Sequence, residues 1–78
     1  MRIRLYGRLA DTIGPEIELS GADGCSVADV RRQLAAIYGQ LAPALGRSRA
    51  VMSDRLVHDE QLVGETDALE FLPPVSGG

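Results

Sequence analysis

A single amphipathic helix in the middle of the chain most constrains the fold. Ser26 is a good helix N-cap, and Asp29, three residues later, completes a pattern of the capping-box type. The helix is predicted from Val27 to Tyr38, with Gly39 as its natural stop. Its apolar stripe consists of Val27, Val30, Leu34, Ile37 and Tyr38. Such a stripe needs an apolar surface to cover, so we expect the helix to lie across one face of a sheet.

Two short strands are predicted before this helix. Apolar and polar residues alternate from Met1 to Tyr6 and again from Glu16 to Leu19. Gly7 and the Gly14-Pro15 pair interrupt the chain between them. If the strands pair antiparallel, the two arginines of the first will share a face with the two glutamates of the second, which is a favourable charge match.

The second half of the chain is predicted to contribute short strands. A helical turn is expected from Leu41 to Leu45, followed by strands at Ala50 to Met52 and Leu56 to Val57. The polar segment 59–67 follows, with Leu62 as its expected inward anchor. The last strand runs from Ala68 to Leu72, because prolines follow it and proline has no amide hydrogen to continue a ladder.

This order of elements predicts an α+β fold of the ubiquitin-like β-grasp type. In that fold a mixed sheet carries one main helix on one face, and the first and last strands are neighbours in the middle of the sheet. We therefore expect residues 1–72 to form the β-grasp domain and residues 73–78 to form an extended C-terminal tail.

The bulk properties exclude several classes of protein. With 78 residues the chain has room for one domain, and a net charge of −3 argues against nucleic-acid binding, which normally needs a basic surface. Its single cysteine excludes an internal disulfide and suits the reducing cytoplasm, where we expect the protein to be located. We expect no signal peptide and no membrane association, because the N-terminus alternates in polarity and no apolar run approaches about 20 residues.

The C-terminal tail is the part of the sequence that points to chemistry. It reads Pro73-Pro74-Val75-Ser76-Gly77-Gly78. Chain ends are commonly disordered, so a plain flexible terminus is one interpretation. However, two prolines directly after a strand favour a stiff, extended arm. Terminal glycines let the backbone approach an active site without a Cβ clash. A stiff base with a slender tip suits insertion into a narrow enzyme channel.

The tail also carries a family resemblance. The segment from Phe71 to Gly78 is similar to the C-terminus of molybdopterin synthase small subunits, which typically read Phe-Phe-Pro-Pro-Val-(Ala/Ser/Thr)-Gly-Gly. The segment from Ile3 to Ala10 resembles the opening strand and turn of the same family. Leu72 stands where the family usually has a second phenylalanine. Related carriers of the thiamine pathway end in Gly-Gly without Pro-Pro-Val.

The resemblance implies that the chain is a sulfur carrier and not an enzyme by itself. In this family an adenylating enzyme, related to ubiquitin-activating enzymes, uses ATP to activate the terminal carboxylate, here that of Gly78. Sulfur then displaces AMP and leaves a thiocarboxylate. The tail enters the large subunit of a heterotetramer, where the sulfur is donated to cyclic pyranopterin monophosphate. The resemblance implies no bound cofactor, and it assigns Pro73, Pro74, Val75, Ser76 and Gly77 to tail insertion.

A partner interface is predicted on the sheet face that the helix leaves open. Strand alternation places Tyr6 and Leu72 opposite the core residues Leu5 and Phe71. The resemblance adds Leu56 to this surface. Apolar residues gathered at the root of the tail are typical of a docking surface, so we expect these three side chains to contact the large subunit.

Other residues of chemical interest are interpreted as structural. Cys25 could act as a nucleophile beside the helix N-terminus, but a residue before the N-cap more often packs as a hydrophobic staple, here against Val30. His58 lies in a polar loop without a clustered set of metal ligands, so no metal site is expected. The acidic residues of the same region are expected to form a solvated rim, and they are Asp59, Glu60, Glu65 and Asp67.

Two other functions share the tail. A thiocarboxylate carrier for another pathway, of the thiamine type, would use the same chemistry with a different acceptor. A ubiquitin-like protein modifier would instead join its terminal glycine to an amine. All eight basic residues are arginine, so the absence of lysine excludes self-linked chains through lysine side chains but not conjugation to other proteins.

Overall fold

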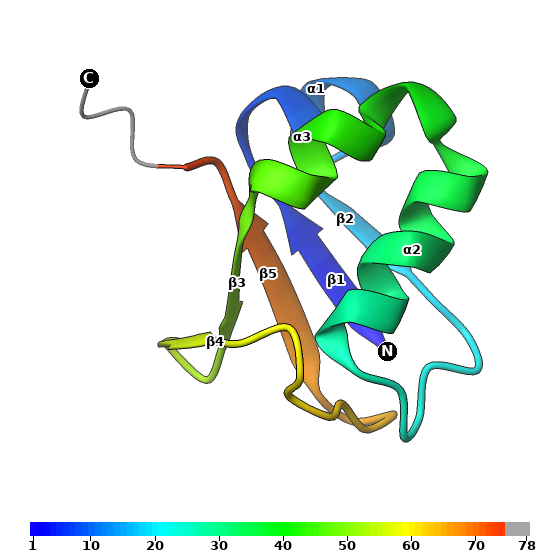
Figure 1. Cartoon of the computed structure of the whole chain (residues 1–78), viewed down its shortest axis with the longest axis vertical. Coiled ribbons are helices and arrows are strands. Elements are labelled where there is room, and N and C mark those ends of the chain that lie inside the picture. The colour runs from blue at the N-terminus through cyan, green and yellow to red at the C-terminus, as the bar shows by residue number, and fades with distance from the viewer. Residues whose placement is uncertain (75–78) are drawn as a thin grey trace.

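A mixed five-stranded sheet with its helices on one face forms the fold (Figure 1). The computed structural model describes residues 1–74. The strand order is β2-β1-β5-β3-β4, and the expected α+β arrangement is confirmed. In chain order the elements are β1 (Arg2–Leu5), α1 (Gly7–Ile13), β2 (Glu16–Glu18), α2 (Val27–Ile37), the 3-10 helix η1 (Gly39–Leu41), α3 (Ala42–Arg47), β3 (Arg49–Met52), β4 (Arg55–Val57) and β5 (Ala68–Leu72). Within these described residues, every helix is too short or too polar to pass through a lipid bilayer.

The first and last strands pair in parallel at the centre of the sheet. Arg2 lies opposite Ala68 and Leu5 opposite Phe71, so β1 ends one residue before the end of β5 at Leu72. β2 pairs antiparallel with the other edge of β1, and β3 pairs antiparallel with β5. Glu16 lies within 3.5 Å of the side chains of both Arg2 and Arg4, as the charge match of the first two strands predicts.

The helix α2 begins at the predicted cap. The Ser26 hydroxyl accepts a hydrogen bond from the Asp29 amide at 3.1 Å, and the Asp29 carboxylate accepts one from the Ser26 amide at 3.2 Å. This reciprocal pair satisfies two amides that a helix N-terminus leaves free. The predicted stripe is wrong at its end, since Ile37 is 61% exposed. Ile37 is the last residue of α2, where the chain turns into η1, and Leu41 and Leu45 fill the core there instead.

The segment between the first two strands is a helix, which the sequence pattern did not predict. In α1, only Leu9 is buried, and the N-terminal residue of the helix has no side-chain cap. Seven residues without a cap would not hold a helix in isolation. Burial of Leu9 against the sheet and contacts with α3 stabilise α1, and these are tertiary effects.

The expected anchor of the polar segment before β5 is also wrong by one residue. Leu62 is 62% exposed, whereas Val63 is buried in the core. Backbone hydrogen bonds set this register, because the Val63 amide donates to the Cys25 carbonyl and the Gly24 amide donates to the Val63 carbonyl, each at 2.8 Å. In an extended segment a shift by one residue exchanges the inward and outward side chains.

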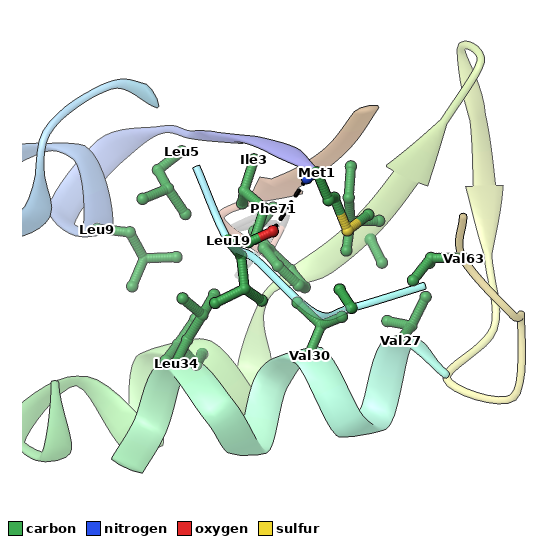
Figure 2. Packing of buried hydrophobic residues seen from close by; sticks show 14 of the residues in the cluster. Met1, Ile3, Leu5, Leu9, Leu19, Val27, Val30, Leu34, Val63 and Phe71 are labelled. Carbon is green, nitrogen blue, oxygen red and sulfur yellow. Dashed lines mark hydrogen bonds between the residues drawn. The ribbon is translucent and has the colours of Figure 1, made fainter. Parts of the chain in front are cut away.

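An entirely apolar cluster fills the space between the sheet and the helices (Figure 2). Its largest fully buried side chains come from β1, β5, α2 and α3, and they are Phe71, Ile3, Leu5, Leu34, Leu45, Leu69, Val27 and Val30. Met1 closes one end of the cluster, where its amino group donates to the Leu19 carbonyl at 2.9 Å. With few aromatics available, aliphatic side chains do most of the packing, as the composition indicates.

Arg31 ties α2 to the segment that joins α3 and β3. Its guanidinium donates to the Ser48 hydroxyl at 2.8 Å, to the Ser48 carbonyl at 2.9 Å and to the Leu45 carbonyl. It also pairs with Asp59 at 3.0 Å and lies over the Phe71 ring, 5.0 Å from the ring centroid. One side chain therefore connects α2, α3, β5 and the loop after β4.

Replacing Arg31 should destabilise the fold more than replacing its neighbour. Arg31→Met leaves the buried Ser48 and the Leu45 carbonyl without their charged donor, and we expect a loss of about 2 kcal/mol in the free energy of unfolding. Arg32→Met is the matched control, because Arg32 is exposed and pairs only with Asp29 among the described residues; it should cost under about 0.5 kcal/mol. Urea denaturation measures both, and equal midpoints would contradict the role assigned to Arg31.

Candidate functional site

The root of the tail is held against the junction of β1 and α1. Because β1 and β5 are parallel and their pairing ends at Leu5 and Phe71, Tyr6 continues from the end of β1 beside Leu72, the last residue of β5. Gly7 has a φ of +61°, which is favourable for glycine. A Cβ at Gly7 would lie 3.5 Å from the Pro73 ring, so the first proline of the tail lies next to the first residue of α1. Residues 73–74, the root of the tail, continue from β5 at this end of the sheet (Figure 1).

The sheet face opposite the helices carries an apolar patch beside this root. Residues paired across a sheet point to the same face, so the pairs Val51–Leu56, Val51–Glu70 and Arg49–Leu72 all belong to the open face. Tyr6 follows the alternation of β1 onto the same face. We call Tyr6, Val51, Leu56 and Leu72 the open-face patch. The exposed fractions are 38% for Tyr6 and 60% for Leu56, and Leu72 is half-buried.

Val51 is the member of the patch that the sequence reasoning missed. It is only 8% exposed, yet it lies on the face opposite the core. The alternation in Ala50 to Met52 contains the signal, because a residue between two core-facing neighbours must face the other way. Val51 is paired with Leu56 on one side and with Glu70 on the other, so its buried side chain lies between these two residues on the open face.

A short hydrogen bond orients Tyr6 at the edge of the patch. The Tyr6 hydroxyl donates to the Glu70 carboxylate at 2.6 Å. This bond raises the pKa of Tyr6 above its ordinary value of 10.0, because the phenol must stay protonated to donate; the nearby charge of Glu70 acts in the same direction, and Arg4 opposes it. Tyr6 is therefore a neutral donor at physiological pH, with its ring held beside β5.

Only the first two residues of the predicted tail lie within the described structure. Pro73 and Pro74 are exposed and lie beyond the end of β5, outside any helix or strand. Val75, Ser76, Gly77 and Gly78 lie outside the described residues. The structure thus places the root of the tail and the surface around it, and the chemical role of the terminal carboxylate stays a prediction.

A family model described as the ThiS family matches residues 3–78, which is almost the whole chain. The chain belongs to the ThiS family. This confirms the sequence-based resemblance at the level of a small ubiquitin-like sulfur carrier. A sequence search among curated proteins finds no match.

Solved structures similar to this ThiS-family carrier confirm the β-grasp fold. SAMP1 from Haloferax volcanii is 19% identical, with a TM-score of 0.70 over 99% of this chain and 97% of that chain. A Pyrococcus furiosus protein assigned as molybdopterin converting factor, subunit 1, is 18% identical, with a TM-score of 0.73 over 95% of each chain. A complex of subunits 1 and 2 of molybdopterin-converting factor from Helicobacter pylori 26695 contains a chain 22% identical to this one, with a TM-score of 0.60 over 99% of this chain and 96% of that chain.

The remaining candidates in this ThiS-family carrier lie apart from the tail. Cys25, which precedes the α2 cap, is partly buried and packs against the core. Its sulfur lies 3.8 Å from the side-chain amide nitrogen of Gln33. His58 follows β4 and is exposed. Together with Arg31 and Asp59 it lines an open cavity of about 440 Å³. Among residues 1–74, no three His, Cys, Asp or Glu side chains converge as metal ligands would.

The acidic residues expected to form a solvated rim have mixed roles. Asp59 pairs with Arg31, and Asp67 accepts a hydrogen bond from the Gly64 amide at 2.7 Å. These two carboxylates therefore stabilise the loops on either side of segment 60–66, because charge-assisted hydrogen bonds restrain the backbone there. Glu60 and Glu65 have exposed side chains.

The Tyr6–Glu70 bond predicts a measurable titration. In a Tyr38→Phe background, which leaves Tyr6 as the only tyrosine, Glu70→Ala should lower the pKa of Tyr6, because the acceptor and its charge are lost. Since the folded-state pKa is raised, the contribution of this bond to stability is complete below pH 10.0 and disappears as the pH rises through the folded-state value. Phenolate absorbance measures the titration, with Glu60→Ala as control; identical curves for the two variants would contradict the assignment.

Proposed function

We propose that this ThiS-family protein is the sulfur-carrier subunit of a molybdopterin synthase, with the Gly78 carboxylate as its working group. The observation that carries the proposal is the position of the tail root. β5 runs straight into Pro73-Pro74, the first of these prolines lies next to Gly7, and the open-face patch lies beside them. A tail that leaves the body at a defined point, next to an apolar surface, suits delivery of its tip into a partner's channel.

The proposed chemistry begins with activation, because a free carboxylate is a poor electrophile. An adenylating enzyme would join the Gly78 carboxylate to AMP from ATP and release pyrophosphate. A sulfur nucleophile would then displace AMP and leave a thiocarboxylate at Gly78. This sulfur would finally be donated to cyclic pyranopterin monophosphate in molybdenum cofactor biosynthesis. The carrier binds no cofactor in this scheme, and ATP belongs to the activating enzyme.

The catalytic groups for the last step belong to a partner in this proposal. The Helicobacter pylori complex of subunits 1 and 2 of molybdopterin-converting factor supports a two-subunit arrangement. We propose that the open-face patch docks on a large catalytic subunit in a heterotetramer. Apolar side chains near an interface centre commonly contribute most of the binding energy, and Leu56 with its high exposure is the best candidate for this role.

Two alternatives use the same tail. The ThiS family model also suits a thiocarboxylate carrier of the thiamine type, and the similarity to SAMP1 keeps a ubiquitin-like protein modifier as a second alternative. The three candidate functions differ in the molecule that accepts the sulfur or the carrier itself. A molybdopterin synthase carrier forms a complex with a large synthase subunit and converts the pyranopterin substrate, whereas a modifier forms an isopeptide with a protein amine.

The tail chemistry predicts that Gly78 is indispensable. Deleting Gly78, or appending one residue after it, should abolish thiocarboxylate formation and leave the melting temperature unchanged, because the tail lies beyond the last strand. Intact mass measurement after incubation with the adenylating enzyme, ATP and a sulfur source detects the exchange of one oxygen for sulfur.

Two variants serve as controls for this measurement. Cys25→Ala and His58→Ala should both accept sulfur normally, since neither residue lies at the tail root. Full activity of the appended protein without trimming would contradict the assignment to Gly78. A severe loss in Cys25→Ala would instead indicate a second sulfur site.

The docking proposal predicts a difference between two equally exposed leucines. Leu56 lies in the open-face patch, whereas Leu62 lies in the loop before β5, where its backbone bridges to Ser26 near the start of α2. Leu56→Glu should weaken binding to the large subunit about thirtyfold, equivalent to about 2 kcal/mol, because a charge would be desolvated in the interface. Leu62→Glu should bind normally, and both variants should keep their melting temperature. Titration calorimetry that finds equal affinities would exclude the open face as the docking surface.

A further inference from the structure

Gly7 leaves room for the first residue of the tail. A Cβ at Gly7 would lie 3.5 Å from Cγ, 3.8 Å from Cβ and 4.0 Å from Cδ of Pro73, so its three nearest contacts outside its own neighbourhood would all be atoms of one ring. A Cβ at Gly21, by contrast, would have no atom of the described residues within 4 Å. The hydrogen that Gly7 carries in place of a side chain therefore faces Pro73.

Residue 7 must also turn the chain from a strand into a helix. Tyr6 is extended, with a φ of −135° and a ψ of 161°, and Gly7 then has a φ of +61° at the start of α1. Residues with a Cβ are strained at positive φ, and asparagine tolerates it better than most. Position 7 thus has two separate requirements, which are a backbone that accepts positive φ and empty space beside Pro73.

The sheet fixes where Gly7 lies relative to the tail root. Leu5 is paired with Phe71, and the Tyr6 hydroxyl donates to the Glu70 carboxylate at 2.6 Å. These contacts hold the two residues before Gly7 against β5. The position of Gly7 is therefore set by the sheet and does not depend on the tail.

The two prolines convert the position of the first ring into a direction of the tail. Ring closure fixes φ of a proline at about −65°, and a residue before a proline is restricted to extended conformations. Few free torsions remain at the root, so a shift of the Pro73 ring redirects the chain that follows it. The two rings also border a cavity of about 220 Å³, which Leu9 and Ala44 help to line, so close packing does not restrain them on every side.

We propose that Gly7 is the positioning residue of the tail, because its missing side chain seats the Pro73 ring and so sets the direction in which the tail leaves the body. This inference rests on the proposed function, in which the tail must enter the active site of a partner. Gly7 itself touches no reacting group and acts through Pro73. A carrier with a redirected tail must recover the productive direction on binding, which raises KM by the fraction of molecules that lack it.

Asparagine and alanine separate the two requirements at position 7. Gly7→Asn places side-chain atoms beyond Cβ beside Pro73 in a residue that tolerates positive φ. Gly7→Ala adds a methyl group at an ordinary contact distance of 3.5 Å, but it is strained at positive φ. Gly21→Asn and Gly21→Ala are the matched controls, since Gly21 has a φ of +76° and open space around it. The assay follows thiocarboxylate formation at Gly78 by intact mass, as a function of carrier concentration, with the adenylating enzyme, ATP and a sulfur source at 25 °C.

KM and the melting temperature should respond to different variants. Gly7→Asn should raise KM for the carrier about tenfold with kcat retained, whereas Gly21→Asn should stay within about twofold of wild type. Gly7→Ala and Gly21→Ala should both lower the melting temperature by about 4–8 °C and leave KM within about twofold. Pro73→Ala alone should raise KM, and adding Gly7→Asn to it should have no further effect, because the ring through which residue 7 acts is gone.

A KM that follows the melting temperature across these variants would overturn the proposal, because Gly7 would then have a structural role only. Equal KM values for Gly7→Asn and Gly21→Asn would overturn it too, as would independent effects of Gly7→Asn and Pro73→Ala. A readout without any enzyme is the nuclear Overhauser effect between the α-protons of Gly7 and the Pro73 ring in the wild-type carrier. We expect this signal, and its absence would show that the seat is not occupied in solution.

Failure of this inference is distinguishable from failure of the proposed function. If wild type acquires sulfur and Gly7→Asn acquires it with the same KM, Gly7 does not position the tail and the proposed function stands. If wild type acquires no sulfur, the proposed function fails, and the role of Gly7 in that function fails with it.

Discussion

The parallel pairing of β1 with β5 is the constraint on which the rest of the structure depends. It joins the two ends of the described chain at the centre of the sheet, and its register from Arg2–Ala68 to Leu5–Phe71 places the end of β1 within one residue of the end of β5. The junction of β1 and α1 therefore lies beside the root of the tail. Without this pairing, Tyr6 and Pro73 would have no reason to be neighbours, and the tail would leave the body at an undefined point.

Sheet geometry also places two chemically different features beside the tail root, and Tyr6 belongs to both. On the open face, strand alternation gathers Tyr6, Val51, Leu56 and Leu72 into an apolar patch. On the helix side, α1 and α3 bring Arg8 and Arg47 to the rim of a small cavity. Arg31 stabilises this second side, because its bonds to Ser48 hold the end of α3 and the start of β3 against α2.

Sequence reasoning succeeded where local signals and periodicity agreed. The Ser26–Asp29 capping box forms as predicted, and the alternation of β1 and β5 places Ile3, Leu5, Leu69 and Phe71 in the core. It failed where tertiary contacts overrode weak local signals. The uncapped α1 is stabilised by burial of Leu9, and the inward anchor of the polar loop is Val63 instead of Leu62 because backbone hydrogen bonds to Gly24 and Cys25 set the register.

The sequence by itself determined the fold class, the central helix and a tail with the chemical character of a carrier. Helix capping, hydrophobic periodicity and the ending of a strand by proline all act over a few neighbouring residues. Only the tertiary structure decided which surfaces surround the tail. Val51 joins Leu56 and Leu72 on one face through strand register, and Arg8 and Arg47 line the same cavity although they lie in two helices that are far apart in the chain. These juxtapositions depend on long-range pairing and packing, which no local pattern encodes.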